Sequence, residues 1–166
     1  MRNHNQYLRW CLRQKRGIRV VAPSDNLMKA YLEKSHNALK SMEVNAQANI
    51  AEWTVSARYY AKYFAVYALL SKIGVKCEIH DCTVALFAYL FGNLEFRQLV
   101  RELRQSKDDR VEAQYYSREL KVNLADVMQQ TKQFVLHIEE LIDRMNSEEI
   151  TTFQQKTKEL MHARKR

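Results

Sequence analysis

The chain has 166 residues, 46% of them hydrophobic, and a net charge of +8, which is enough material for one domain with its own core. It contains only three glycines and one proline, so the composition excludes a predominantly β-sheet protein, in which turn residues recur, and predicts long helices joined by short loops. No uncharged stretch approaches the roughly 20 residues of a membrane span, and we predict a protein that does not enter the membrane.

The first predicted element is a basic N-terminal arm over residues 1–23. The first 24 residues have a net charge of +6 and contain no acidic side chain. Within them we expect a short helix around residues 6–14 and an extended segment at residues 18–21, separated by Gly17. The chain opens without the apolar run of a secretory signal, and three cysteines, an odd number, fit a reducing compartment better than a disulfide framework. We therefore expect a cytoplasmic protein with buried thiols.

Residues 24–145 are predicted to form the bundle core. Its first helix starts at the Pro23-Ser24-Asp25 stretch, with a capping oxygen ahead of Leu27, and reaches about residue 44. The second helix, about residues 49–73, is apolar on nearly all sides, which predicts a place at the centre of a bundle or in an oligomer. Only Arg58 and Lys62 interrupt it, and they require a solvent slot, an acidic partner or a bound anion, because unpaired buried charge is costly. The apolar surface has three sides. The aromatic stripe consists of Trp53, Tyr60, Phe64 and Tyr67, and the alanine ridge consists of Ala57, Ala61, Ala65 and Ala68. The third, mixed side consists of Tyr59, Tyr63, Val66 and Leu70.

Three more core helices and a basic terminal helix follow. Asp81 caps a helix that stops at Gly92, and the next helix covers about residues 94–107, ending in a polar, less regular stretch at residues 106–109. The helix over about residues 120–145 carries apolar residues that alternate by three and four, the pattern of a bundle seam. This seam consists of Leu124, Val127, Thr131, Phe134, Ile138, Leu141 and Met145. Ser147 caps the last helix, over residues 146–166.

These elements predict an all-α fold. The architecture is an up-and-down bundle of four to five helices with short extra helices at the termini, in a single domain over residues 1–166. The last 11 residues have a net charge of +4, which leaves −2 for residues 25–155. Basic ends suit a polyanion through counterion release, and charged ends also keep a protein soluble. Both interpretations remain open.

The pair His80-Asp81 is the most suggestive candidate for chemistry. A histidine that titrates near neutral pH can exchange a proton with a ribose hydroxyl, helped by the cations Arg58 and Lys62. The plainer interpretation, which we favour, makes Asp81 a helix cap and His80 a loop residue packed on the bundle.

Two further sets of side chains fit nucleic acid. Arg97, Arg101 and Arg104 lie together on one helix flank, where they can follow a phosphate backbone, although solvated basic stripes are commoner. Tyr59, Tyr60 and Tyr63 can stack on bases, but inside so apolar a helix they are expected to be core residues.

A metal site is not predicted. Cys77, His80 and Cys82 offer three ligands within six residues, but structural zinc needs a fourth ligand, usually from a second close pair, and the chain has none. The chain also lacks a glycine-rich phosphate loop, a nucleophile elbow and a zinc-protease motif. We predict no cofactor.

A longer pattern resembles the HEPN domain, in particular small prokaryotic HEPN proteins. Residues 56–70 read Ser-Ala-Arg-Tyr-Tyr-Ala-Lys-Tyr-Phe-Ala-Val-Tyr-Ala-Leu-Leu and are followed by Gly74 and His80; residues 109–116 read Asp-Arg-Val-Glu-Ala-Gln-Tyr-Tyr. The resemblance covers about residues 24–145.

The resemblance implies a helical bundle that forms a homodimer. It also implies a neighbouring minimal nucleotidyltransferase, with which such proteins form two-component, often toxin–antitoxin, systems. Many HEPN proteins bind or cut RNA, and those that cut it carry an arginine, four to six other residues, and then a histidine. None of the five histidines here has an arginine at that spacing, so the resemblance does not extend to ribonuclease activity.

The leading hypothesis is a non-catalytic, homodimeric HEPN-like protein that binds RNA or a nucleotide and has a minimal nucleotidyltransferase as partner. The anion would be held by Arg58, Lys62 and His80, with Arg97, Arg101 and Arg104 as auxiliary contacts. One alternative is a metal-independent ribonuclease that uses Arg58 and His80. The other is a structural module for protein assembly.

Overall fold

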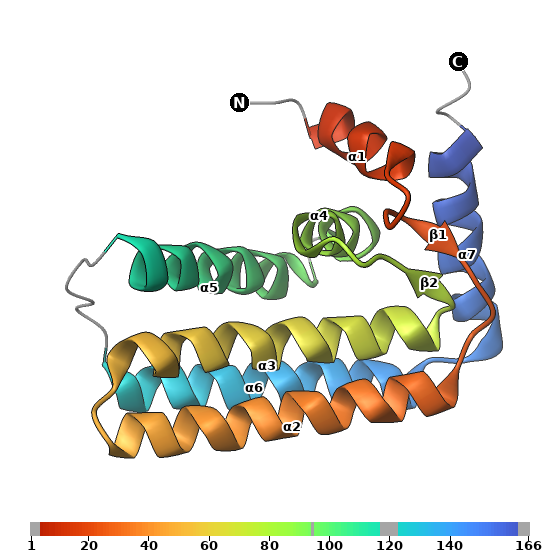
Figure 1. Ribbon diagram of the computed structural model, residues 1–166. Helices are drawn as coiled ribbons and strands as arrows, with labels where there is room; N and C mark the ends of the chain where they lie inside the picture. The colour runs from red at the N-terminus through yellow and green to blue at the C-terminus, as the bar shows by residue number, and fades with distance from the viewer. Residues whose placement is uncertain (1–3, 94, 117–122, 163–166) are drawn as a thin grey trace.

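The computed structural model describes residues 4–93, 95–116 and 123–162 of the chain (Figure 1). These residues form seven α-helices and one two-stranded antiparallel sheet. The all-α prediction is confirmed. The elements are α1 (His4–Arg13), β1 (Arg19–Val20), α2 (Asp25–Gln47), α3 (Ala51–Lys72), β2 (Val75–Lys76), α4 (His80–Phe91), α5 (Arg97–Tyr115), α6 (Leu124–Arg144) and α7 (Ser147–His162).

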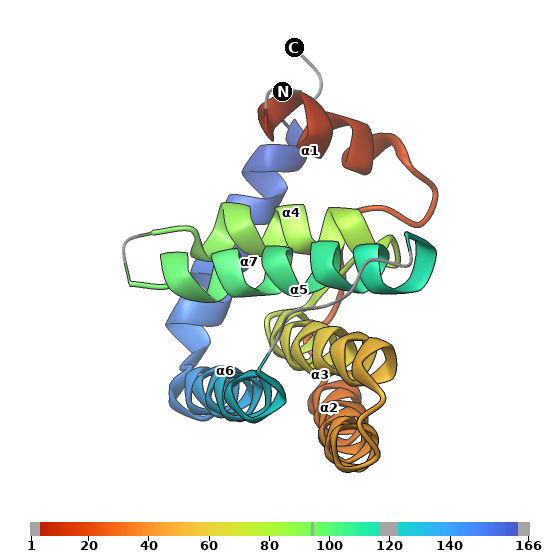
Figure 2. The same ribbon diagram turned by 90° about the vertical axis from the view of Figure 1, so that its left-hand side faces the viewer.

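Helix α3 is the central element. It contacts α2, α5 and α6. In Figure 2, α2, α3 and α6 are seen end-on as three aligned helices, with α2 below α3, α6 beside them and α5 above α3. Helix α4 is seen end-on in Figure 1 and side-on in Figure 2, so it runs across the direction of these three helices. Sixteen of the 22 residues of α3 are buried, which confirms the prediction that the all-round apolar helix is central.

The alanine ridge of α3 packs against α2, as its small side chains predicted. Ala61, Ala65 and Ala68 are fully buried, and the buried Ser35 of α2 donates a hydrogen bond of 2.8 Å to the carbonyl oxygen of Ala61. A side chain of α2 reaches the α3 backbone in this way only where the two helices approach closely. The aromatic stripe varies in burial along its length, from Tyr67, which is buried, to Trp53, which is 56% exposed.

The heptad-like pattern of α6 is a bundle seam, as predicted, and α6 packs against α3 and α2. The five central residues of the seam are buried, and Leu124 and Met145 at its ends are partly buried. Thr131 occupies a seam position without cost because its hydroxyl donates to the carbonyl oxygen of Val127 at 2.6 Å. A polar residue satisfied by its own helix can therefore lie in an otherwise apolar seam.

A short sheet fixes the N-terminal arm to the bundle. Arg19 pairs with Lys76 and Val20 with Val75, so the extended segment predicted at residues 18–21 is confirmed. Gly74 has a φ of +72°, and a Cβ there would lie 2.6 Å from the carbonyl oxygen of Val21. Glycine is required at this turn because no other residue accepts both the dihedral angle and the close approach.

Helix α5 is longer than predicted. The stretch at residues 106–109 is regular helix, and α5 continues to Tyr115. Its polarity misled the prediction, because Ser106 is buried with its hydroxyl bonded to the carbonyl oxygen of Leu103, and Asp109 has a basic partner on α3. The predicted start of the next helix at residue 120 lies outside the described residues, as do residues 163–166 of the predicted terminal helix.

The caps of the last two helices are asparagines. The side chain of Asn123 accepts from the backbone amides of Ala125 and Asp126. The side chain of Asn146 accepts from the amides of Glu148 and Glu149 at 3.0 Å. Asn146, one residue before the predicted Ser147, therefore caps α7.

The expectation of three thiols is wrong. Cys11 of α1 and Cys82 of α4 form a disulfide across 71 residues of sequence, and only Cys77 is a free, buried thiol. The chain turns at Gly17 and lays α1 back on α4, which brings the two cysteines together. The number of cysteines does not reveal which of them meet in the folded chain.

None of the helices in the described part of the chain is long and apolar enough to span a membrane.

Candidate functional site

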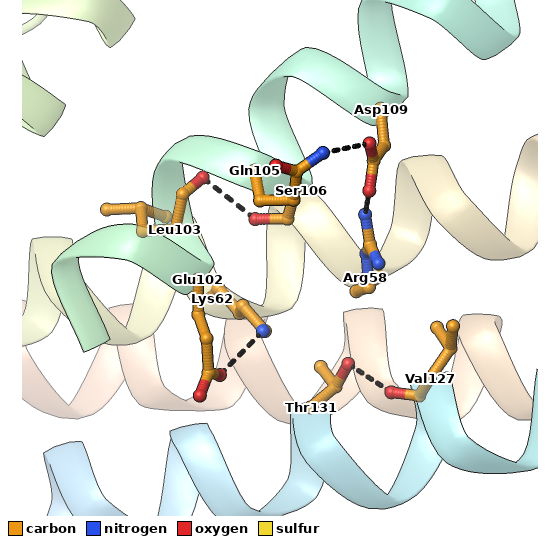
Figure 3. Close-up of polar contacts among 9 residues, drawn as sticks. All are labelled: Arg58, Lys62, Glu102, Leu103, Gln105, Ser106, Asp109, Val127 and Thr131. Atoms are coloured by element: carbon orange, nitrogen blue, oxygen red, sulfur yellow. Dashed lines mark hydrogen bonds and ion pairs between the residues drawn. The ribbon is translucent and has the colours of Figure 1, made fainter. Parts of the chain in front are cut away.

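The two basic residues of α3 are buried in ion pairs with α5. The Arg58 guanidinium pairs with the Asp109 carboxylate, and the Lys62 ammonium donates to the Glu102 carboxylate at 3.0 Å (Figure 3). Gln105 also donates to Asp109, at 2.7 Å. Of the three possibilities that the sequence left open for these cations, the structure has the acidic partner.

These ion pairs hold α5 in register on α3. From Arg58 to Lys62 the residue number rises along α3, whereas from Asp109 to Glu102 it falls along α5, so the two helices run in opposing senses at this contact. Helix α5 crosses α3 obliquely, because it is seen side-on in Figure 2, where α3 is seen end-on. Burial lowers the pKa of Lys62, and the charge of Glu102 opposes that shift. Because both cations are neutralised by carboxylates, neither has an uncompensated charge to offer to a ligand.

The interpretation of Asp81 as a helix cap and His80 as a loop residue is wrong, because α4 begins at His80, its N-cap is Ile79 and Asp81 lies in the first turn. His80 lies among the tyrosines of α3. Its Nδ1 is 2.9 Å from the Tyr59 hydroxyl. Its ring is stacked on that of Tyr63, with the centroids 4.2 Å apart and the planes 1° from parallel. Tyr60 meets the same imidazole edge-on, at 6.2 Å. The spacing of 59, 60 and 63 places all three rings on the side of α3 that faces the start of α4.

Arg110 of α5 completes this cluster. Its guanidinium lies 5.1 Å from the ring centroid of Tyr60 and 5.5 Å from that of Tyr59. This is cation–π geometry, in which the faces of aromatic rings hold a cation that keeps its full charge. No carboxylate among the described residues forms an ion pair with Arg110, and its Nε is buried without a hydrogen-bond acceptor.

The electrostatic environment of His80 favours the neutral imidazole. Partial burial lowers its pKa from the ordinary value of 6.5, the charge of Arg110 lowers it further, and Asp81 acts in the opposite direction. Asp81 itself is paired with Lys107 of α5 at 2.6 Å. Burial also raises the pKa of Tyr59, so its hydroxyl stays protonated. When that hydroxyl donates to Nδ1, the imidazole carries its own proton on Nε2, where it can donate to a ligand.

A polar cleft of about 470 Å³ adjoins the cluster, between α1, α4 and α5. Arg104 and Lys107 contribute basic side chains to its wall, and Asp81 and Asp108 contribute acidic ones. Arg97 and Arg101 lie exposed on the same helix but do not line this cleft. The predicted arginine stripe is therefore divided, since only Arg104 lies beside His80-Asp81.

The profile of the HEPN domain matches residues 28–156 of the chain. The chain belongs to the HEPN domain family. No curated protein and no solved structure matches it. The match extends beyond the predicted core of residues 24–145 into α7, so this HEPN domain includes part of the terminal helix.

The structure places the six predicted site residues of the HEPN domain in three settings. Arg58 and Lys62 are neutralised inside the bundle, His80 and Arg104 lie at the α4–α5 face, and Arg97 and Arg101 are exposed on α5. Arg58 is thus not the arginine beside His80.

Sequence reasoning missed Arg110 as the cation that lies beside His80. Its position within the Asp109–Tyr116 segment was the available signal, because that segment is part of the HEPN resemblance. The predicted end of the helix near residue 107 hid it, since an arginine beyond the helix cannot be assigned to a face.

The cysteines of this HEPN domain do not assemble a metal site with His80. Cys82 is in the disulfide, and the Cys77 thiol donates to the carbonyl oxygen of Ile79 at 3.6 Å. Within the described ranges, no three His, Cys, Asp or Glu side chains are grouped as ligands for a metal ion.

Proposed function

We propose that this HEPN protein binds RNA or a nucleotide at the α4–α5 face, with Arg110 and His80 as the central contacts. The observation that carries the proposal is the state of Arg110, which rests on two tyrosine rings and has no carboxylate partner among the described residues. A cation held in this way is preorganised for a phosphate, since a bound anion replaces no internal ion pair.

The neighbouring groups supply the other contacts that a nucleotide needs. His80 can donate from Nε2 to a phosphate or a base edge, and Tyr60, which is half-buried, offers a ring for stacking. Arg104 and Lys107 extend the positive charge along the adjoining cleft. In this proposal Arg58 and Lys62 act indirectly, because their ion pairs hold α5 and thereby place Arg110.

Family membership extends the proposal to partners. HEPN domains commonly dimerise, and we propose a homodimer that works with a minimal nucleotidyltransferase in a two-component, toxin–antitoxin-like system. Arg97 and Arg101, exposed beyond the cleft, are auxiliary contacts for a longer RNA. Co-expression of the chain with the nucleotidyltransferase encoded beside its gene, followed by size-exclusion chromatography, tests this arrangement.

The test of the binding site is the affinity for a short fluorescent single-stranded RNA, measured by anisotropy over a salt series. We expect affinity to fall with salt, as it does when phosphates displace counterions. Arg110→Gln should weaken binding about tenfold, within the range of a charge-assisted contact. Circular dichroism of the variant should be unchanged, because Arg110 closes no ion pair with any residue that the structure describes.

The matched control is Lys40→Gln, which removes one positive charge from the exposed side of α2. It should leave the affinity within about twofold of the wild type, since an isolated surface charge contributes little at moderate salt. Equal losses in the two variants would contradict a site at Arg110 and leave only general attraction by a basic protein. No binding at any salt concentration would favour a module for protein assembly.

Metal-independent RNA cleavage is the second candidate. The arginine that would act with His80 in cleavage is Arg110, because Arg58 is paired with Asp109. Cleavage requires the other tautomer of His80, in which Nδ1–H donates to the Tyr59 hydroxyl and Nε2 is free to accept a proton from a ribose hydroxyl. A nearby guanidinium can stabilise the phosphorane charge. The same mixtures, run on a denaturing gel with chelator present, decide between the two. Cleavage that disappears in His80→Ala would establish the nuclease, and intact RNA would leave a binding protein.

A further inference from the structure

A second basic hollow lies away from the His80 cluster, where the N-terminal arm meets the last turn of α7. It has a volume of about 680 Å³ and is lined by Leu12, Arg19, Val20, Val21, Lys158, Met161 and His162. The described lining residues therefore divide into four apolar side chains without rings and three basic ones, among them the His162 imidazole, and none of the described ones is acidic. Figure 1 shows α7 passing beside β1, the two elements that carry Arg19, Val20, Lys158, Met161 and His162 of this lining.

Two donor atoms of Arg19 make no hydrogen bond to the described residues. Its Nε and Nη2 atoms are shielded from solvent and have no hydrogen-bond acceptor among the described residues, although the side chain as a whole is 43% exposed. The nearest carboxylate, that of Glu78, is 3.4 Å from Nη2. A shielded guanidinium donor without an acceptor is costly unless a ligand satisfies it.

Glu78 cannot neutralise the positive charge here. It is shared among three cations, with Lys76 at 2.7 Å, Arg19 at 3.4 Å and Arg16 at 3.9 Å. One carboxylate for three cations leaves the sheet with an excess of positive charge. Lys158 adds to that excess on the opposite wall of the hollow.

We propose that this hollow binds a small amphipathic anion, with an aliphatic chain on Leu12, Val20, Val21 and Met161 and a phosphate or carboxylate head on Arg19 and Lys158. The lining favours an aliphatic body over a nucleobase, because four apolar side chains without rings form most of the wall and the one ring among the described lining residues is the His162 imidazole at its edge. Apolar walls with a few convergent polar groups are the usual composition of a small-molecule site. The site is independent of the proposed RNA contacts on α4 and α5.

The probe is octyl phosphate below its critical micelle concentration, titrated into the full chain by isothermal calorimetry. Inorganic phosphate and octanol are the comparison ligands. Octyl phosphate should bind at one site, at least about tenfold more tightly than either comparison ligand, because it alone combines apolar burial with a charged head. Equal affinity for octyl phosphate and inorganic phosphate would overturn the aliphatic part of the proposal.

Arg19→Gln and Lys158→Gln should each weaken octyl phosphate binding about tenfold, as expected for the loss of a charge-assisted contact. Arg16→Gln is the matched control: Arg16 shares Glu78, is 78% exposed and does not line the hollow. It should leave the affinity unchanged. A loss of affinity in Arg16→Gln equal to that in Lys158→Gln would overturn the site. Binding of the protein to anionic vesicles without binding of monomeric octyl phosphate would overturn it as well. RNA affinity should be unchanged in Lys158→Gln.

Discussion

The Lys62–Glu102 pair joins two residues with unequal access to water. The Lys62 side chain is 4% exposed, whereas that of Glu102 is 25% exposed. If either partner is removed, the other must find new solvation, and only Glu102 can reach water by a change of rotamer. The free energy of unfolding should therefore respond differently to loss of the two charges, because an unpaired buried charge is the expensive outcome.

We expect Glu102→Gln to lower the free energy of unfolding by about 2 kcal/mol and Lys62→Met to lower it by about 1 kcal/mol or less. Urea unfolding at pH 7, followed by circular dichroism, measures both. Because neither substitution changes side-chain size greatly, packing contributes little to the difference. Equal losses, or a larger loss in Lys62→Met, would mean that the ammonium has water access that the structure does not show.

The same pair predicts a pH dependence. The folded-state pKa of Lys62 lies below the ordinary value of 10.5 because of burial, and Glu102 opposes that shift, so Glu102→Gln should lower this pKa further. Between the folded-state pKa and about 10.5 the unfolded chain binds a proton that the folded chain does not, and stability rises with pH in that window. The deficit of Glu102→Gln relative to wild type should therefore shrink as pH rises from about 8 to about 10. Parallel urea curves at each pH test this, and a constant deficit would contradict it.

At the scale of helices, the fold depends on how closely α2 approaches α3. Alanines at three- and four-residue spacing leave no side-chain atoms beyond Cβ on that side of α3, and the Ser35–Ala61 hydrogen bond spans the interface at 2.8 Å. Such packing has no room for added atoms, because protein interiors have the density of molecular crystals.

Ala61→Leu should lower the free energy of unfolding by about 2 kcal/mol or more, because the larger side chain must push α2 away or adopt a strained rotamer. Ala30→Leu makes the same change at an exposed position of α2 and should cost less than about 0.5 kcal/mol. Urea unfolding of the two variants beside wild type makes the comparison. A tolerated Ala61→Leu would show that α2 can shift without loss of the bundle.

For the whole molecule, the Cys11–Cys82 disulfide closes a loop of 71 residues that contains α2 and α3. Long loops lose the most chain entropy when closed, and the chain-entropy relation assigns such a bridge about 4 kcal/mol. The bridge also attaches α1 to α4 two residues beyond His80. This one covalent bond therefore contributes to the free energy of unfolding and also fixes the position of α1 on α4.

Reduction with a phosphine should lower the melting temperature of the wild type by about 10 °C, from the loss of loop closure in a chain of this size. Differential scanning calorimetry with and without reductant measures the shift. The double variant Cys11→Ala with Cys82→Ala should melt near the reduced wild type and should not respond to reductant. An unchanged melting temperature in the reduced wild type would show that packing of α1 alone holds the arm.

Periodicity and composition determined the helices, the central place of α3 and the seam of α6. These features depend on the local spacing of apolar residues, and a helix with apolar residues on all sides has only one favourable place, the middle of the core. The family resemblance was likewise recognised from the Tyr- and Ala-rich run of α3 and from the positions of Gly74 and His80 in the sequence.

Only the tertiary structure decided which polar groups meet. Each of these contacts joins residues on different helices. They are the ion pairs of Arg58 and Lys62, the disulfide between Cys11 and Cys82, and the approach of Arg110 to His80. Their distances depend on crossing angles and on the axial register of α5 and α1, and helical periodicity specifies the face of a residue but not the element opposite it. The candidate site belongs to this second class, because its cation and its histidine come together only when α5 is in register on α3.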